Sequence, residues 1–194
     1  LCGNESTFTQ TITVISVVNV TMRVFLEGPY VQATERMNDD LRFDGLLPLT
    51  QPYTIAPFNY AGNETAAPGL FASSDPDNAI VDWVLLELRD PATPTIIVAR
   101  RAALVQRDGD VVDVDGTSSV TFSNLAAGSY HVAVRQRNHL GAMTALPLGL
   151  SATSTSIDFT TSALQTYGSE ACKTIGKVAH GFVSEHRAIV DMKR

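Results

Sequence analysis

Two alternating runs of apolar residues meet at a short corner between residues 120 and 134. Side chains along a strand point alternately to its two faces, so every second residue of each run can reach one core. Gly128 and its small neighbours lie at the corner between the runs. The pattern predicts two half-buried strands that lead from one part of a β-sandwich to another. The side chains expected in the core are Val120, Phe122, Leu125, Tyr130, Val132 and Val134.

Further strands are expected on both sides of this corner. Residues 79–90 and 95–107 are rich in β-branched and apolar residues and are separated by a Pro-containing turn, which predicts a β-hairpin. The first of these strands is apolar on both faces, so Trp83 is expected in the core of a central strand, with Val81 and Leu85 on its face. With closing strands near residues 146–150 and 156–160, seven to nine strands are expected.

The fold prediction is therefore an all-β, Greek-key β-sandwich of the Ig-like or transthyretin-like kind, with long loops. Residues 28–78 are rich in Pro, Gly, Asn and Asp, which predicts loops, a short helical turn near residues 37–41 and one or two edge strands. Binding surfaces of sandwiches usually lie in such loops.

Three segments are distinguished. Residues 1–18 alternate Thr with apolar residues and are expected to form an N-terminal strand, with a junction near Asn19. Residues 19–171 form the sandwich module. Residues 172–194 carry a net charge of +3 against −6 for the whole chain, and predict a short docked helix or a disordered basic tail.

Charge and cysteine usage restrict the class of protein. A net charge of −6 disfavours binding to nucleic acid, and no segment approaches the ~20 apolar residues that cross a bilayer, so membrane insertion is not expected. The composition, rich in Thr, Ser, Val and Gly, is typical of secreted β-proteins. Cys2 and Cys172 lie near opposite ends of the chain and predict a disulfide worth about 2 to 5 kcal/mol, with two separate thiols or an intermolecular bridge as alternatives.

An acidic turn is the best candidate for a ligand site. Asp108, Asp110, Asp113 and Asp115 lie within residues 108–116, where their oxygen atoms could converge on calcium. The spacing differs from that of a calcium-binding loop, and Asp and Gly are also the usual residues of solvated turns. Residues 38–40 (NDD) could supply further carboxylates or cap the short helix.

The remaining polar residues favour a structural interpretation. The chain has no phosphate-binding loop, nucleophile elbow or paired-cysteine motif, so no catalytic residue, cofactor or enzymatic activity is predicted. His131 is expected to point outward from its strand. Five arginines on neighbouring strands could contact an anion or glycan, but pairing with acids such as Asp82 and Glu87 is the favoured interpretation. They are Arg100, Arg101, Arg107, Arg135 and Arg137.

Three stretches carry a resemblance to a known family: residues 80–89 (IVDWVLLELR), 101–116 (RAALVQRDGDVVDVDG) and 130–141 (YHVAVRQRNHLG). They resemble a module of large secreted or cell-surface proteins of Bacteroidota, and the resemblance spans about residues 20–171. In those proteins the module often follows Ig-like PKD repeats, and residues 7–14 (TFTQTITV) are similar to the last strand of such a repeat. The resemblance implies export by the type IX route and a location outside the cell or on its surface.

The sequence thus predicts a non-catalytic structural or adhesive module of a bacterial surface protein. Its expected partners are other domains or subunits of a surface assembly, and glycans. Two alternatives remain open. The N-terminal strand could complete the sheet of a neighbouring copy and build an extracellular fibre, or the loops of residues 28–78 could form a carbohydrate-binding surface.

Overall fold

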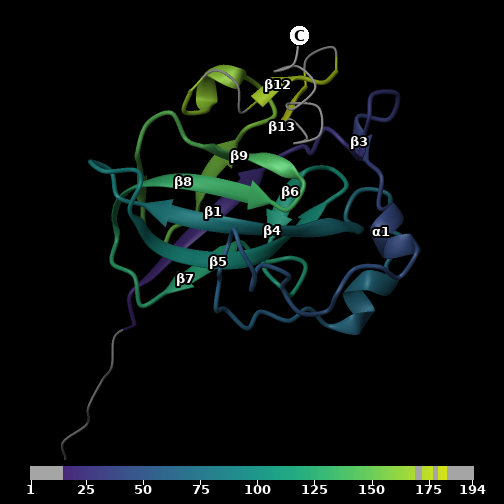
Figure 1. Ribbon diagram of the computed structural model, residues 1–194, viewed down its shortest axis with the longest axis horizontal. Helices are drawn as coiled ribbons and strands as arrows, with labels where there is room; N and C mark the ends of the chain where they lie inside the picture. Colours follow the sequence, from purple (N-terminus) through teal and green to yellow (C-terminus); the bar gives the residue numbers. More distant parts are fainter. Residues whose placement is uncertain (1–14, 169–171, 177–178, 183–194) are drawn as a thin grey trace, which may run out of the picture.

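The computed structural model describes residues 15–168, 172–176 and 179–182 (Figure 1). Strands account for 43% of the structure and helices for 7%, which confirms the all-β prediction. Among the described residues, no helix combines the length and the apolar character needed to cross a membrane. Cys2, the alternating residues 7–14 and the end of the basic tail, residues 183–194, lie outside the described residues.

Nine strands of the described chain form one large sheet in the order β10–β8–β4–β5–β6–β1–β11, with β9 beside β8 and β7 beside β1. All pairs are antiparallel except β1 with β11. The bounds are β1 (Val17–Arg23), β4 (Ile80–Arg89), β5 (Ile97–Gln106), β6 (Asp110–Val112), β7 (Val120–Ser123), β8 (Gly128–Gln136), β9 (His139–Met143), β10 (Leu148–Leu150) and β11 (Thr155–Asp158).

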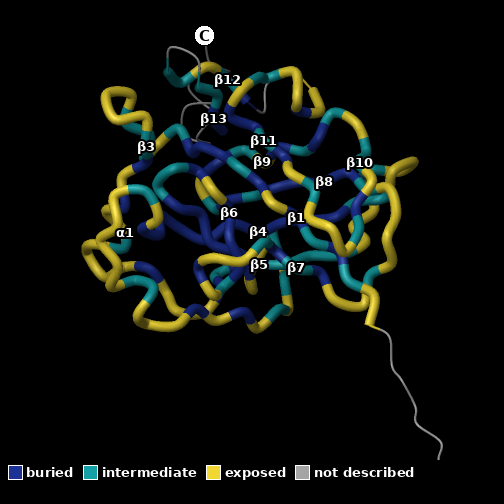
Figure 2. Tube along the Cα trace, turned by 180° about the vertical axis from the view of Figure 1, so that it is seen from behind, coloured by how far each residue is buried: buried dark blue, intermediate teal, exposed yellow. Residues whose placement is uncertain are grey.

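The large sheet folds over an apolar core, which we call the sandwich core. Val18, Val20 and Met22 of β1 share this core with Val84 and Leu86 of β4, and the strands β7, β8 and β11 contribute further residues. In Figure 1, β1 crosses behind β4 and β8. The buried residues lie along these strands, and the exposed residues lie mainly on the surrounding loops (Figure 2). The arrangement is consistent with a β-sandwich, while the Ig-like or transthyretin-like topology stays a prediction.

The expected corner after residue 120 is present. β7 pairs with β1, whereas β8 pairs with β4, so the chain changes its partner strands between Ser123 and Gly128. Val120, Phe122 and Val132 enter the same core, as the alternation predicts.

β4 is buried along nearly its whole length and lies between β5 and β8, which confirms the prediction of a central strand. Trp83 is fully buried. The predicted assignment of two residues to faces is wrong, because Val81 belongs to the sandwich core and Ile80 lies on the Trp83 side. A break in the register with β5 between Ile80 and Asp82 inserts one residue and reverses the alternation there.

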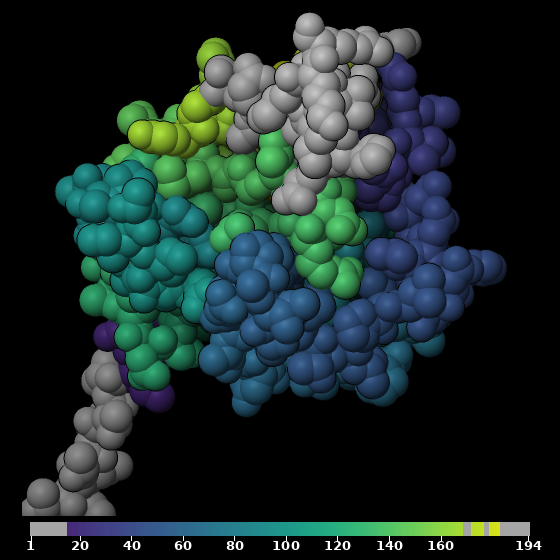
Figure 3. Space-filling model, in the orientation of Figure 1, coloured from purple at the N-terminus to yellow at the C-terminus, as the bar shows by residue number. Residues whose placement is uncertain are grey.

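The segment before β4 forms a loop layer, residues 39–78, which covers the outer face of β4 and β5. It is blue in Figure 3. Tyr53 and Leu47 pack against Trp83 and Leu85 in a second apolar cluster. Tyr53 donates a hydrogen bond of 2.7 Å to the Trp83 carbonyl, and the Trp83 indole N–H donates one of 2.8 Å to the Pro48 carbonyl. The loop layer is therefore part of the core of the protein.

The short elements near this layer agree with the expected edge strands and helical turn. β2 (Tyr30–Val31) and β3 (Arg36–Met37) form a small hairpin, followed by the short helix α1 (Asp40–Phe43) and the 3₁₀ helix η1 (Pro68–Ala72). Asp39 precedes α1 without capping it through its side chain. Its carboxylate forms ion pairs with Arg42 and Arg107 at 2.5 Å, which tie α1 to the end of β5.

The predicted junction near Asn19 is wrong, because β1 runs through it without a break. The Asn19 side chain donates a hydrogen bond to the Ala152 carbonyl at 2.7 Å and accepts one from the Thr121 hydroxyl at 2.8 Å. Asn19 therefore joins β1 to two neighbouring segments. The boundary expected between residues 18 and 19 lies inside a strand of the sandwich.

The prediction of a short docked helix in the tail is wrong for the described residues 172–176 and 179–182. β12 (Cys172–Thr174) and β13 (His180–Phe182) form an antiparallel hairpin that follows the 3₁₀ helix η2 (Ala163–Gln165). Phe182 enters the sandwich core, and its backbone bonds to Phe25 and Glu27. Cys172 is buried, and its Sγ lies 3.6 Å from the Phe159 carbonyl oxygen. Its pairing with Cys2, which lies outside the described residues, stays a prediction.

Replacing Tyr53 by Phe tests the attachment of the loop layer. Tyr53→Phe leaves the buried Trp83 carbonyl without its side-chain donor, so we expect the free energy of unfolding in urea to fall by about 1 to 2 kcal/mol. Tyr130→Phe is the matched control, because the Tyr130 hydroxyl bonds to the Ala126 carbonyl near solvent, and we expect a change within about 0.5 kcal/mol. Equal losses in the two variants would contradict this role of Tyr53.

Candidate functional site

A pocket with a volume of about 410 Å³ lies where four segments of the chain meet. Its lining comes from the β1–β2 connection, the residues around the start of α1, the start of β4 and the β8–β9 turn. Leu26 and Val81 supply apolar surface, while Asp82, Gln136 and His139 supply polar groups. A concave, mainly apolar site with a few convergent polar groups is the usual form of a ligand site. We call it the His139 pocket.

A chain of hydrogen bonds holds the polar groups of this pocket. Nδ1 of His139 lies 2.8 Å from Oε1 of Gln136, and the Gln136 amide donates to Asp82 at 2.7 Å. Arg137 donates to the same carboxylate at 2.7 Å. On the other side of the imidazole, the Gly28 N–H donates to Nε2 at 3.3 Å. Because Nε2 accepts a hydrogen bond, this network assigns the imidazole proton to Nδ1.

Burial shifts the pKa of the two buried titratable groups of the pocket, His139 and Asp82. Removal from water lowers the pKa of the His139 imidazole to about 4, and the carboxylate of Glu27 opposes this shift. Removal from water also raises the pKa of the Asp82 carboxyl, against the opposing effect of Arg137. At neutral pH the imidazole is therefore uncharged.

The inner groups of the pocket are committed to protein partners, whereas its mouth is open. The Nε2 lone pair of His139 cannot accept a substrate proton without losing the Gly28 hydrogen bond. Asn38, Asp40 and Asn138 line the mouth and are exposed. Their side chains make no hydrogen bond to other described residues. The arrangement suits binding of a polar partner at the mouth better than proton transfer inside.

The four aspartates of the predicted calcium site do not converge. Asp113 forms a two-pronged ion pair with Arg101, with distances of 2.7 and 3.0 Å. Asp115 instead accepts hydrogen bonds from the backbone of Thr117 and Ser118. In the described part of the chain, no group of three or more His, Cys, Asp or Glu residues is placed to hold a metal ion. The turn has the local hydrogen bonds of the solvated alternative.

Asp108 and Asp110 remain near each other in this turn. The Asp108 carboxylate accepts a hydrogen bond from the Asp110 N–H at 3.0 Å, and Asp110 lies 3.9 Å from Arg23. Burial, followed by the charge of Asp108, raises the pKa of the Asp110 carboxyl. Residues 38–40 do not join this group, since Asp39 pairs with arginines and Asp40 lines the His139 pocket.

The five arginines are mostly paired with acids, as the structural interpretation predicts. Arg137 pairs with Asp82 at 2.7 Å, and Arg135 lies 3.7 Å from Glu87. Arg107 pairs with Asp39 and Arg101 with Asp113. Arg100 donates to the Phe58 carbonyl at 2.7 Å and so holds the loop layer. Each of the five arginines therefore contacts a different partner or segment.

The prediction that His131 points into solvent is wrong. His131 lies on the outer face of β8, as its position in the strand requires, but only 4% of it is exposed. Its Nδ1 lies 2.9 Å from the Thr144 carbonyl, and its ring meets the ring of Tyr167 edge-on with a centroid distance of 6.2 Å. Tyr167, which follows 36 positions later in the chain, covers His131. The periodicity of a strand does not reveal such a long-range contact.

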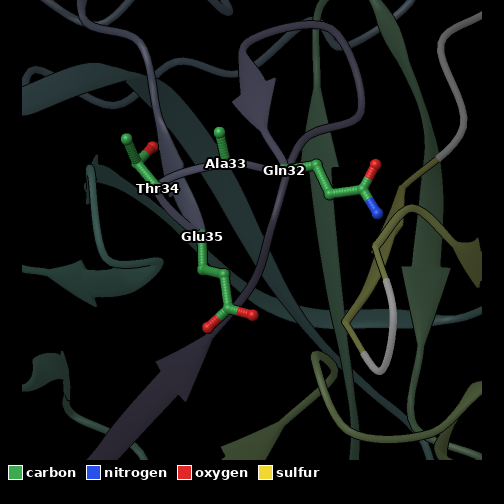
Figure 4. A pocket seen from close by; sticks show the side chains of 4 residues that line it. All are labelled: Gln32, Ala33, Thr34 and Glu35. Atoms are coloured by element: carbon green, nitrogen blue, oxygen red, sulfur yellow. The ribbon is translucent and has the colours of Figure 1, made fainter.

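The loops of residues 28–78 are divided between packing and exposure: Tyr53 and other apolar residues pack against β4 and β5, while Asn38 and Asp40 are exposed at the His139 pocket. A carbohydrate-binding surface in these loops stays a prediction. A hollow of about 620 Å³ lies at the turn between β2 and β3. Among the described residues, its lining consists of Gln32, Ala33, Thr34 and Glu35, and their side chains point in different directions (Figure 4). These four side chains do not converge on a common point.

No family model, curated protein or solved structure matches the chain.

Titration of His139 tests the environment of the pocket. We expect the Cε1 proton of His139 to titrate in NMR with a pKa near 4, where an unfolded histidine has about 6.5. Since the unfolded state takes up this proton first, the free energy of unfolding falls as the pH decreases from about 6.5 to 4, by up to about 3 kcal/mol. His139→Gln removes this part of the pH dependence. A midpoint near 6.5 in the folded protein would contradict the burial of the imidazole.

Proposed function

We propose that the chain is a non-catalytic adhesive module of an extracellular bacterial surface protein and binds its partner at the mouth of the His139 pocket. The observation that carries the proposal is the contrast between the inside and the mouth of the pocket. Asp82 and His139 are held by internal hydrogen bonds, while Asn38, Asp40 and Asn138 are exposed.

The chemistry of the mouth favours a neutral, hydroxyl-rich partner. Amide groups both donate and accept hydrogen bonds, and the Asp40 carboxylate accepts them, so together they match sugar hydroxyl groups. Leu41 lines the pocket beside them with 38% of its surface exposed and offers an apolar contact. A negatively charged partner would be repelled by Asp40.

The surroundings of the pocket support a role as a rigid scaffold. The loop layer is held to the sheet by buried contacts of Tyr53 and Trp83 and by the ion pairs of Asp39. A preorganised surface loses little conformational entropy on binding. The resemblance of residues 80–89 to the Bacteroidota module supports the extracellular location, in which a disulfide between Cys2 and Cys172 is also expected.

Affinity electrophoresis in gels that contain neutral polysaccharides tests the proposal. We expect the full chain to be retarded by at least one neutral polysaccharide without forming new reducing ends. Asn38→Ala and Asn138→Ala should each weaken the retardation several-fold, whereas the control Asn63→Ala, an exposed residue of the loop layer, should not change it. Release of reducing ends, or retardation that is equal in all variants, would contradict the proposal.

A second candidate function is that of a fibre subunit, and the edge of β5 favours it. β6 pairs with β5 only at Leu104 and Val105. The loop layer covers the next part of this edge. The Tyr60 hydroxyl donates a hydrogen bond to the Arg100 carbonyl, and the Ala102 N–H donates one to the Glu64 carboxylate. Further along, Ile96, Ile97 and Val98 are 55%, 40% and 44% exposed. An apolar edge of this kind can accept a strand from another copy, such as residues 7–14.

Sedimentation velocity and negative-stain images separate the two functions. A fibre subunit is expected to form polymers that are lost on deletion of residues 7–14 and in Val98→Lys, because a charged side chain blocks strand addition at an edge. Leu164→Lys is the control, since Leu164 is 88% exposed and lies in η2. A monomer at all concentrations would exclude the fibre.

A further inference from the structure

A second depression, with a volume of about 320 Å³, lies on the outer face of the sheet over β8 and β9. Ala133 of β8 and Gly141 of β9, an alanine and a residue without a side chain, form part of its lining. Arg89 at the end of β4, Arg135 of β8 and Tyr167 also line it. We call it the Arg135 groove. The strands that bear it, β4, β8 and β9, lie in the front of the molecule in Figure 1, and this face is visible in Figure 3.

Arg135 brings hydrogen-bond donors to the groove that the protein does not use. Its guanidinium lies 4.8 Å from the centre of the Phe58 ring and 3.7 Å from a Glu87 oxygen, and it makes no hydrogen bond to another described residue. About 31% of the side chain is exposed. A Cβ at position 141 would lie 3.2 Å from Cγ of Arg135, so Gly141 provides the space in which this side chain lies.

Arg89 is fixed in place. Both its Nε and Nη2 donate to one oxygen of Glu87, and its Nη1 donates to the Pro94 carbonyl at 3.0 Å. Glu87 is 1% exposed, and its other oxygen, which faces Arg135, accepts no hydrogen bond from the described residues. Two guanidinium groups and one carboxylate leave the groove with one net positive charge. That charge matches a ligand with a single negative charge better than a phosphate dianion.

Tyr167 adds an exposed aromatic ring to this cationic surface. Its N–H donates to the Met143 carbonyl at 2.7 Å, which fixes it beside the end of β9. Its ring meets His131 edge-on, and 58% of the residue remains exposed. An aromatic ring with one free face stacks well on the apolar C–H face of a sugar, and its polar hydroxyl can stay in water.

We propose that the Arg135 groove binds a sugar ring that carries one carboxylate. Arg135 would receive the carboxylate through its unused N–H donors, since a guanidinium fork matches the two oxygens of a carboxylate. Tyr167 would stack on the ring, and the methyl group of Ala133 and the missing side chain of Gly141 leave room for it. The volume is at the lower end of the range for small-ligand sites, which suits one or two sugar rings. The site is separate from the His139 pocket and does not depend on the function proposed for that pocket.

Calorimetric titration of the full chain with two sugars that carry a carboxylate tests the proposal. Oligogalacturonate carries the carboxylate on ring after ring, and sialyllactose carries it on a terminal sugar. Methyl-esterified oligogalacturonate has the same rings without the charge. We expect the acid forms to bind at least ten-fold more tightly than the ester, and binding to weaken at high salt concentration. The acid that binds more tightly, oligogalacturonate or sialyllactose, shows which kind of acidic sugar the groove prefers.

Variants locate the binding in the groove. Arg135→Gln and Tyr167→Ala should each weaken binding of the acid form at least ten-fold. Arg36→Gln and Phe43→Ala are the matched controls, because Arg36 pairs with Asp77 outside the groove and Phe43 is 80% exposed in α1. Tyr167 is 58% exposed, so its variant should remain folded even if Arg135→Gln does not fold. Equal affinity for acid and ester, no binding of either acid at millimolar concentration, or binding that Tyr167→Ala leaves unchanged would overturn the proposal.

Discussion

The burial of β4 on both of its faces is the constraint on which the rest of the structure depends. One face of this strand, with Val84 and Leu86, enters the sandwich core, and the other, with Trp83 and Leu85, needs a second cover. Fully burying each large apolar side chain is worth about 1.5 to 3 kcal/mol, so an uncovered outer face would lose a large part of the stability of a domain. The loop layer supplies this cover without regular strands, and its hydrogen bonds to Trp83 hold it there.

The same strand explains where the two candidate sites lie. β4 contains two buried carboxylates, Asp82 and Glu87, which are 2% and 1% exposed. Buried charges need partners. Here the partners are Arg89 of β4, Arg135 of β8 and Arg137, which directly follows β8. Around Asp82 the network reaches His139 and forms the inner wall of one pocket. Around Glu87 the arginines remain partly exposed and give the outer groove its positive charge.

The strands could be predicted from the sequence, because alternation and β-branched residues report burial directly. The hairpin of β4 and β5 and the corner after β7 follow from local patterns of this kind. The face reversal at Val81 could not be predicted, since a β-bulge leaves the composition unchanged. The hairpin of β12 and β13 was also missed, because Gly176 and Gly181 weaken a helix without indicating the long-range contacts of Phe182.

The candidate sites were harder to predict than the strands. The four aspartates of residues 108–116 are close in sequence, but Arg101 and the turn backbone take up Asp113 and Asp115. His139 and Tyr167 owe their roles to segments distant in the chain. One signal was available in the sequence. Asp82 interrupts an apolar run that reads as a fully buried strand, and a charge in such a place implies a buried partner and a polar network around it.

Hydrogen exchange measured residue by residue tests the central claim that the loop layer is part of the core. The amides of Gln51, Tyr60 and Ala66 donate hydrogen bonds within the loop layer, and those of β4 bond to its neighbouring strands. If both faces of β4 are covered in one cooperative unit, the loop amides should exchange as slowly as those of β4, through global unfolding. Fast exchange of the three loop amides beside a protected β4 would contradict the account and would make residues 39–78 an independent, mobile surface.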